Sequence, residues 1–268
     1  MTDIAQTVRR ALEEDIGAGD VTSEACVPAG RRATGRFIAR QRFVLAGTEV
    51  LALIYDSLHL CKHDGDIVHD GDILAEVEGS ARRLLTCERT ALNFLQRLSG
   101  VATLARAFAE RVQGTRCKVL DTRKTTPGLR VLEKHAAAAG GITNHRMGLY
   151  DAILIKNNHI AAAGGVKQAL ENARAAGTLP IEIEVRTKSE LDEALANGAG
   201  KLLLDNLTPA QASEWIREIA GRATVEISGG VTLETLRAYA ETGADYVSAG
   251  AITHSAPAVD ISFRLELL

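Results

Sequence analysis

The sequence predicts a mixed α/β protein whose C-terminal half is a β/α barrel. Short apolar runs alternate there with amphipathic helical segments, which is typical of parallel strands joined by helices. Polar and charged residues follow each apolar run directly, as at the C-terminal face of a barrel. An open, doubly wound sheet is the alternative. It is disfavoured because no GxGxxG motif follows an early strand.

Composition excludes several classes of protein. The 268 residues are 46% hydrophobic and 24% charged, with a formal net charge of -3, so no global basic field indicates nucleic-acid binding. No apolar run has the roughly 20 residues of a membrane helix, and the N-terminus lacks the apolar core of a signal peptide. The four cysteines have no metal-ligand spacing and read as buried free thiols of a cytoplasmic protein.

The N-terminal elements follow from caps and periodicity. A first helix is expected to begin at Thr2 or Asp3 and to stop near Gly17, before a turn-rich loop with the sequence EDIGAGDVTS. Alternation predicts a strand from about Ala33. A helix from about Thr48 to Leu60 follows.

Two short apolar runs joined at residues 69–72 predict a β-hairpin. Their Gly-Asp pattern also resembles lipoyl and biotinyl carrier domains. Those domains present a modifiable lysine on the next turn, and the residues that follow here, GSARR, contain none. We therefore interpret the segment as a structural hairpin.

A long helix is predicted after this hairpin, with Thr86 as its cap and a break near Gly100. Arg89 would lie in its first turn, where a cation is poorly matched to the helix dipole. The side chain is therefore either a solvated surface arginine or a functional one.

Six strands are predicted after residue 113, with the sequences KVLD, AILIK, IEIEV, KLLLD, TVEIS and DYVSAG. Helices between them begin at recognisable signals: a capping box at Thr187 with Glu190, a Thr208-Pro209 start, and Thr232. The strands end in DTRK, KNNH, EVR, DN, SGG and SAG.

Acidic residues at these strand ends need compensation. Glu182 and Glu184 alternate with apolar residues and share one face, and Asp205 follows three leucines. Buried carboxylates require a metal ion or a paired cation. Hard oxygen ligands without cysteine suit Mg²⁺ or Mn²⁺. The alternative is that Glu184 and Asp205 pair with Lys156 or Arg123.

The last two strand ends predict a phosphate site. Small residues there let backbone N–H groups approach an anion, at the loops where barrels often bind phosphate. The residues are Ser228, Gly229, Gly230, Ser248, Ala249 and Gly250.

Cations also gather at the predicted mouth. They would repel one another without an anionic ligand, so we expect a polyanionic substrate. The residues are Arg123, Lys124, His145, Arg146 and Lys156. As an alternative, Lys156 is a Schiff-base lysine of a phosphosugar barrel enzyme, which would require a desolvated amine.

With these residues in view, the chain closely resembles the quinolinate phosphoribosyltransferases, the decarboxylating enzymes of de novo NAD biosynthesis. The resemblance spans nearly the whole chain in family order. It rests on the segments EDIGAGDVTS, CERTALNFLQRLSGVAT, DTRKTTPGLR, NHRMGLYD, LIK-x-NHI, IEIEV, LLDN, ISGGV and SAGAITHSAPAVDIS. A related family, the molybdenum-transport-associated ModD-type transferases, is less similar around NHRMGLYD and LIK-x-NHI and stays as an alternative.

The resemblance implies an N-terminal α/β sandwich over residues 1–113 and an incomplete, seven-stranded α/β barrel over residues 114–254. Residues of about 255–268 would pack back on the sandwich. It also implies a cytoplasmic homodimer, or a hexamer built as a trimer of dimers, in which each sandwich covers the partner's barrel mouth. Neither nucleic acid nor a membrane is an expected partner.

The resemblance further implies the roles of single residues. Lys124, Lys156, Glu184 and Asp205 match catalytic positions, and the last two also match the site near the ribose and Mg²⁺. The loops at Ser228 and Ser248 match the 5′-phosphate site. Arg89, Arg123, Lys124, His145, Arg146 and Lys156 match the pocket for quinolinate and phosphoribosyl diphosphate, with Arg89 contributed by the neighbouring subunit.

The chain departs from the family pattern at three places. Asn157 stands where an aspartate is usual, and Ile142 stands where a third glycine is frequent. Arg186-Thr187 replaces a common Glu-Asn. These departures bear on the arrangement around the metal ion.

Overall fold

The computed structural model describes residues Ile4–Leu268, so the proposed caps Thr2 and Asp3 lie outside the described residues. The chain forms two compact units. The first takes the chain up to Arg106 together with Thr125–Gly141 and Ile252–Leu268, and the second takes Ala107–Lys124 and Ile142–Ala251. No described helix is long and apolar enough to cross a membrane.

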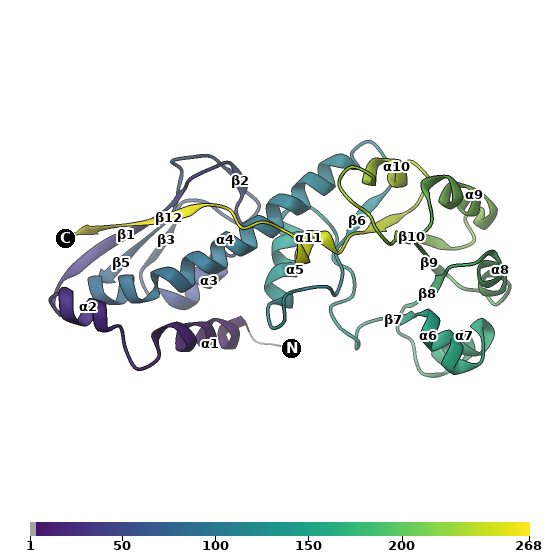
Figure 1. Ribbon diagram of the computed structural model, residues 1–268, viewed down its shortest axis with the longest axis horizontal. Coiled ribbons are helices and arrows are strands. Elements are labelled where there is room, and N and C mark those ends of the chain that lie inside the picture. Colours follow the sequence, from purple (N-terminus) through teal and green to yellow (C-terminus); the bar gives the residue numbers. More distant parts are fainter. Residues whose placement is uncertain (1–3) are drawn as a thin grey trace. The chain divides into compact units, whose positions relative to one another are not determined.

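A four-stranded sheet organises the first unit, with the order β12-β1-β5-β3. Alternate residues of the central strand β1 are buried, and the Phe37 ring packs 4.9 Å from that of Phe263. Helices α1, α3 and α4 lie on one side of this sheet (Figure 1). The strands are β1 (Arg32–Ala39), β3 (Leu58–Leu60), β5 (Ile73–Ser80) and β12 (Ile261–Leu267).

The predicted hairpin is wrong. A turn does form at residues 69–72, where Asp72 N–H donates to the carbonyl of His69 at 3.1 Å. However, β4 (Ile67–Val68) pairs with β2 (Phe43–Val44), whereas β5 pairs with β1 and β3. The turn therefore carries the chain from one sheet into another, and distant strands decide the pairing.

Two N-terminal helices differ from their predictions. The loop expected after α1 (Ile4–Ile16) contains a second helix, α2 (Val21–Cys26). Asp20 caps α2, and its hydrogen bonds from Ser23 lower the pKa of the Asp20 carboxyl. The third helix, α3, spans only Thr48–Ile54, because the chain then becomes strand β3.

The long helix α4 (Ala81–Arg111) begins earlier than predicted and has no break. Thr86 is inside it and donates its hydroxyl hydrogen bond to the carbonyl of Arg82, so it is not the cap. Arg89 is consequently in the third turn, where it is exposed. Gly100 has a packing role: a Cβ built there would lie 2.0 Å from the carbonyl oxygen of Pro257.

Replacing Gly100 with alanine is therefore expected to destabilise the protein. Helix propensity alone would favour alanine by about 1 kcal/mol, but the backbone clash with Pro257 outweighs this and leaves a net loss of about 1–3 kcal/mol. Urea unfolding measures the change. The matched control is Gly200→Ala, where the added Cβ meets nothing within 4 Å. Equal midpoints for the two variants would contradict the packing role.

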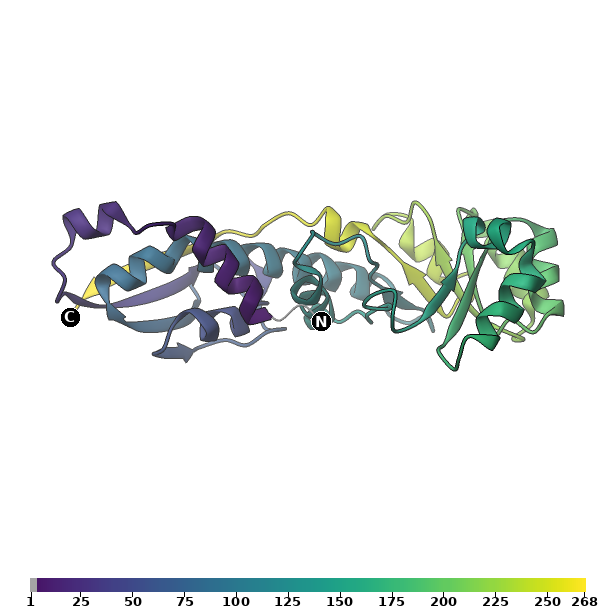
Figure 2. The ribbon, with the colours of Figure 1, turned by 90° about the horizontal axis from the view of Figure 1, so that it is seen from below.

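A parallel sheet of six strands organises the second unit, in the order β6-β11-β10-β9-β8-β7. Leu202 and Leu204 are buried on the face opposite to Lys201 and Asp205. Helices α6 to α9 flank the sheet (Figures 1 and 2). The strands are β6 (Lys118–Leu120), β7 (Ile153–Ile155), β8 (Ile181–Val185), β9 (Lys201–Asp205), β10 (Thr224–Ser228) and β11 (Tyr246–Ser248).

The six predicted strands are confirmed, but a seventh is not present as a strand in the described chain. A single parallel bridge between Leu120 and Thr143 marks its place beside β6. The expected incomplete, seven-stranded barrel is therefore present as a parallel α/β sheet of six strands, with this single bridge in the place of the seventh.

The helices confirm most of the predicted starts. Both capping boxes are present, at Thr187 with Glu190 and at Thr208 with Gln211. The last predicted start was wrong, because Thr232 forms a turn with Thr235 before α10. The helices are α5 (Arg130–Ala139), α6 (Asn157–Ala163), α7 (Val166–Ala175), α8 (Lys188–Ala196), α9 (Pro209–Ile219), α10 (Leu236–Ala240) and α11 (Ala251–His254).

All four cysteines are free thiols. Cys87 and Cys117 are buried as expected, whereas Cys26 and Cys61 are exposed, so burial was predicted correctly for only half of them.

Candidate active site

Asp121 joins two of the predicted site segments. Its side chain is fully buried at the end of β6 and accepts hydrogen bonds from the backbone N–H of His145 at 2.8 Å and from Asn144 Nδ2 at 2.6 Å. The bridge from Leu120 to Thr143 lies beside these contacts. The DTRK strand end therefore fixes the NHR segment, and His145 is directed into the interior of the sheet.

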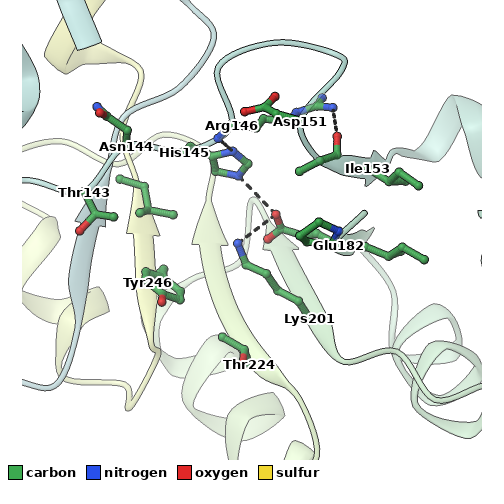
Figure 3. Close-up of a pocket in the computed structure, with 14 residues that line it drawn as sticks. Thr143, Asn144, His145, Arg146, Asp151, Ile153, Glu182, Lys201, Thr224 and Tyr246 are labelled. Carbon is green, nitrogen blue, oxygen red and sulfur yellow. Dashed lines mark hydrogen bonds and ion pairs between the residues drawn. The ribbon is translucent and has the colours of Figure 1, made fainter. Parts of the chain in front are cut away.

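His145 lies against two buried carboxylates. Its Nε2 is 3.3 Å from an oxygen of Glu182 on β8 and 3.3 Å from one of Glu226 on β10. Lys201 reaches the same two oxygens, at 3.1 and 3.2 Å. Figure 3 shows His145, Glu182 and Lys201 pointing toward one another from three different elements. Two cations, His145 and Lys201, thus compensate two buried carboxylates, Glu182 and Glu226. We call these residues the cluster.

The two ring nitrogens of His145 have opposing environments. Nδ1 accepts the backbone N–H of Arg146 at 2.7 Å, which favours the neutral ring with its proton on Nε2. Burial also opposes a charge, but the hydrogen bonds to Glu182 and Glu226 outweigh it and raise the pKa of His145 to about 9. The two carboxylates favour the imidazolium, whereas the Arg146 N–H at Nδ1 favours the neutral ring.

The carboxylates of the cluster are shifted in opposite directions. Burial tends to raise the pKa of Glu226, but the hydrogen bond from His145 and the nearby charges lower it to about 2. Burial raises the pKa of Glu182, and the repulsion from Glu226 adds to this. The hydroxyl of Ser248 also donates to Glu226 and helps to lower its pKa. The cluster therefore titrates as one unit.

A cavity of about 460 Å³ adjoins this cluster. His145, Arg146 and Lys201 line it, together with Tyr246, whose ring lies 5.2 Å from the Lys201 ammonium. Burial lowers the pKa of Arg146, and the charge of Arg123 lowers it further. The Arg146 guanidinium at the wall of this cavity favours an anionic ligand.

A second group of charges lies at the ends of β7, β8 and β9. Lys156 Nζ is 4.0 Å from Glu184 Oε2. The backbone N–H of Lys156 donates to the ring of His159 at 2.9 Å, which fixes the start of α6 and explains the spacing of the LIK-x-NHI segment. Arg186 lies within 2.9 Å of both Glu184 and Asp205. The predicted acidic pair is therefore present, with an arginine between its members.

The two small-residue loops differ in their backbone contacts. Gly229 and Gly230 both have positive φ, 98° and 61°, a conformation that favours glycine. At the other loop, the N–H of Ala249 donates to the carbonyl of Leu120 at 3.1 Å, so this amide is already used within the sheet. The Ala249 amide is therefore not available to an anion.

The structure thus divides the predicted site residues of the second unit. His145 and Arg146 line the cavity, Arg123 interacts with Arg146, and Lys156, Glu184 and Asp205 form the strand-end group. Lys124 is exposed next to Arg123. Arg89 is an exposed residue of α4 in the first unit.

Four residues of the site were not identified from the sequence as functional. Glu226 shares the period-two alternation of its strand, a signal that was used for Glu182 and Glu184 but not for β10. Lys201 begins a strand rather than ending one. Asp121 was read as part of a strand end, and Arg186 as a departure from a pattern.

Comparisons with known proteins agree over the whole chain. A family model described as the N-terminal domain of quinolinate phosphoribosyl transferase matches residues 20–99, and the model of the C-terminal domain matches residues 101–264. The chain is 42% identical to a probable carboxylating nicotinate-nucleotide pyrophosphorylase of Bacillus subtilis, over 95% of this chain and 90% of the relative. It is 43% identical to the Mycobacterium leprae enzyme of that name, over 97% and 96%.

Solved structures give the same result. NadC from Streptococcus pyogenes is 41% identical, with a TM-score of 0.93 over 99% of this chain and 97% of that chain. The nicotinate-nucleotide pyrophosphorylase from Ehrlichia chaffeensis is 34% identical, with a TM-score of 0.94 over 98% and 99%.

Proposed function

The chain belongs to the quinolinate phosphoribosyl transferase family, and from this premise we propose that it is a decarboxylating phosphoribosyltransferase of de novo NAD biosynthesis. The pyridine nitrogen of quinolinate attacks C1 of phosphoribosyl diphosphate, and diphosphate leaves. The 2-carboxylate is then lost as CO₂ and a proton takes its place, giving nicotinate mononucleotide. The observation that carries this assignment is the cavity lined by His145 and Arg146, where the carboxylates of a diacid would bind.

We assign the cavity to quinolinate. Arg guanidinium groups match carboxylates with paired hydrogen bonds, and a charged His145 would add positive charge next to them. Held by Arg123, Arg146 and His145, the two ring carboxylates would fix the ring so that its nitrogen faces the ribose. Lys124, Lys156 and the partner subunit's Arg89 complete the expected cationic set, and the Ser228–Gly230 loop would receive the 5′-phosphate.

Glu184 and Asp205 are the groups that we assign to the ribose. Positive charge grows at C1 as diphosphate departs, and carboxylates already in place stabilise it without reorganisation. Once the ring nitrogen carries the ribose, the positive ring accepts the electron pair of the breaking C–CO₂ bond. No covalent enzyme intermediate is required.

The acidic pair also suits Mg²⁺. A single nitrogen of Arg186 is within 2.9 Å of both carboxylates, so their oxygens converge on one cationic point. Hard carboxylate oxygens are the ligands that Mg²⁺ prefers. Bound there through Glu184 and Asp205, directly or through the diphosphate, the ion would neutralise charge on the leaving group.

Release of labelled CO₂ from the 2-carboxylate of quinolinate tests the assignment. We expect release only when phosphoribosyl diphosphate is present, with diphosphate formed in equal amount. Neither product, from folded protein with Mg²⁺, would reject the proposed reaction.

The Schiff-base alternative has a separate test. The Lys156 side chain is 51% exposed and contacts Glu184, whereas a Schiff-base lysine is usually desolvated. Borohydride should therefore trap no adduct at Lys156. A trapped adduct would favour the phosphosugar alternative, and failure with quinolinate but turnover of a related pyridine or pyrimidine acid would favour a ModD-type transferase.

We propose that the active enzyme is a cytoplasmic homodimer, or a trimer of such dimers, with shared sites. Exposed free thiols at Cys26 and Cys61 suit a reducing compartment.

Hybrid dimers test the sharing of sites. Arg89→Ala and Arg123→Ala should each abolish activity, whereas a 1:1 mixture should recover about a quarter of wild-type activity, because half the dimers are hybrids with one intact site each. Activity assays before and after subunit exchange measure this. Proven exchange without recovery would contradict a shared site.

A further inference from the structure

The guanidinium group of Arg186 lies between the carboxylates of Glu184 and Asp205, the acidic pair. Its Nη2 is 2.8 Å from Glu184 Oε1 and 2.9 Å from Asp205 Oδ2. Glu184 is nearly inaccessible, with 4% of its side chain exposed, and Asp205 has 12% exposed. The arginine side chain itself is 45% exposed. One half-exposed guanidinium thus covers two carboxylates that are otherwise largely buried.

The backbone of Arg186 is held independently of its side chain. Its N–H donates to Glu190 Oε2 at 2.8 Å, as part of the capping arrangement at the start of α8. The side chain can therefore leave the carboxylates by rotation about its own bonds, with the loop and the helix start in place. Half of its surface already faces solvent, so this movement requires no opening of the core.

Other cations cannot fully replace Arg186 in the described structure. Lys156 is 4.0 Å from the other oxygen of Glu184, at the limit of an ion pair. Asp205 accepts a neutral hydrogen bond from Asn206 Nδ2 at 2.8 Å, on the same oxygen that Arg186 contacts. Arg186 is the cation shared by both carboxylates, so any incoming cation that uses both of them must displace it.

We propose that Arg186 is the resident counter-ion of the Glu184–Asp205 pair and that it competes with a divalent cation for this pair. The inference rests on the role that the proposed function gives to these two carboxylates. It assigns to Arg186 a function in setting how much free divalent cation the enzyme requires. Positive charge that develops on the ribose of the substrate would also compete with Arg186 for Glu184 and Asp205.

Binding of Mn²⁺ to the full-length protein without substrates tests the inference. Electron paramagnetic resonance of free Mn²⁺ gives the dissociation constant directly. Loss of two partly exposed ion pairs in Arg186→Gln should tighten Mn²⁺ binding by about five- to thirtyfold. Arg186→Lys keeps the charge and should bind Mn²⁺ much as wild type does.

Lys188→Gln is the matched control. Lys188 lies two residues away and pairs with Asp192 and Glu218 rather than with the acidic pair. Its replacement removes the same charge from the same region, and its Mn²⁺ affinity should stay within about twofold of wild type. Equal affinities in Arg186→Gln and Lys188→Gln, or weaker binding in Arg186→Gln, would overturn the inference.

Thermal unfolding separates competition from a purely structural clamp. A competitor predicts that Mn²⁺ raises the unfolding midpoint of Arg186→Gln more than that of wild type, because the ion fills the vacated place. A clamp predicts a lowered midpoint that Mn²⁺ does not restore. Neither measurement uses turnover, so failure of the proposed reaction and failure of this inference remain distinguishable.

Discussion

Asp205→Asn is expected to lower kcat for nicotinate mononucleotide formation by about two to three orders of magnitude. The asparagine keeps the size of the side chain and loses the negative charge that would face C1 as the diphosphate bond breaks. An interaction that strengthens only in the transition state affects kcat, so KM for quinolinate should change little. Initial rates over a range of both substrates, at saturating Mg²⁺, give the two parameters.

Asp192→Asn supplies the control for this variant. Asp192 is an exposed carboxylate of α8, paired with Lys188. Its neutralisation removes the same charge outside the acidic pair and should leave kcat within about twofold, as is usual for a surface ion pair. If Asp205→Asn behaved like Asp192→Asn, the carboxylate could not be the group that stabilises charge at C1.

Local signals predicted the second unit well. Its strands and helix starts depend on apolar alternation and capping residues, which lie close together in sequence, and the boxes at Thr187 and Thr208 were found in this way. The predictions were wrong where residues far apart in the sequence determine the local structure. Gly100 was taken for a helix break because its neighbour Pro257 is far along the chain. The turn at residues 69–72 gave no sign that its two strands pair elsewhere.

The chemistry of the site was predictable where it lies at strand ends. Glu184 and Asp205 stand there, and the resemblance to a family supplied their roles. Arg186 could be noted only as an unusual residue, since the sequence does not show that its long side chain folds back between the two carboxylates. Lys201 was missed because it begins its strand and still reaches the interior.

Glu226→Leu is expected to destabilise the protein by about 3–5 kcal/mol near pH 6, because it leaves His145 and Lys201 to share one buried carboxylate. Glu226 is only 1% exposed, so water cannot take its place without a rearrangement. Urea unfolding of wild type and variant measures the difference in free energy. Glu171→Leu, at an exposed carboxylate of α7 that pairs with Lys167, is the control and should change stability by less than about 1 kcal/mol.

The pH dependence of this difference identifies its cause. The pKa of His145 is raised from 6.5 to about 9 in the folded protein, so its contribution is fully present below pH 6.5 and is lost as the pH rises through 9. The pKa of Glu226 is lowered from 4.5 to about 2, so its contribution is present above pH 4.5 and is lost as the pH falls toward 2. Both pKa shifts arise largely from the ion pair between His145 and Glu226, so their contributions to stability are not added together.

The stability difference between wild type and Glu226→Leu should therefore be largest between pH 4.5 and 6.5 and should shrink on either side. Lys201 keeps its charge over this range, so part of the difference should persist at pH 9. A purely steric effect of leucine would be constant with pH, because packing does not depend on protonation. A difference that does not shrink between pH 6.5 and 9 would thus show that His145 is neutral when it contacts Glu226, and the positive charge assigned to it in quinolinate binding would have to come from Arg123 and Arg146 alone.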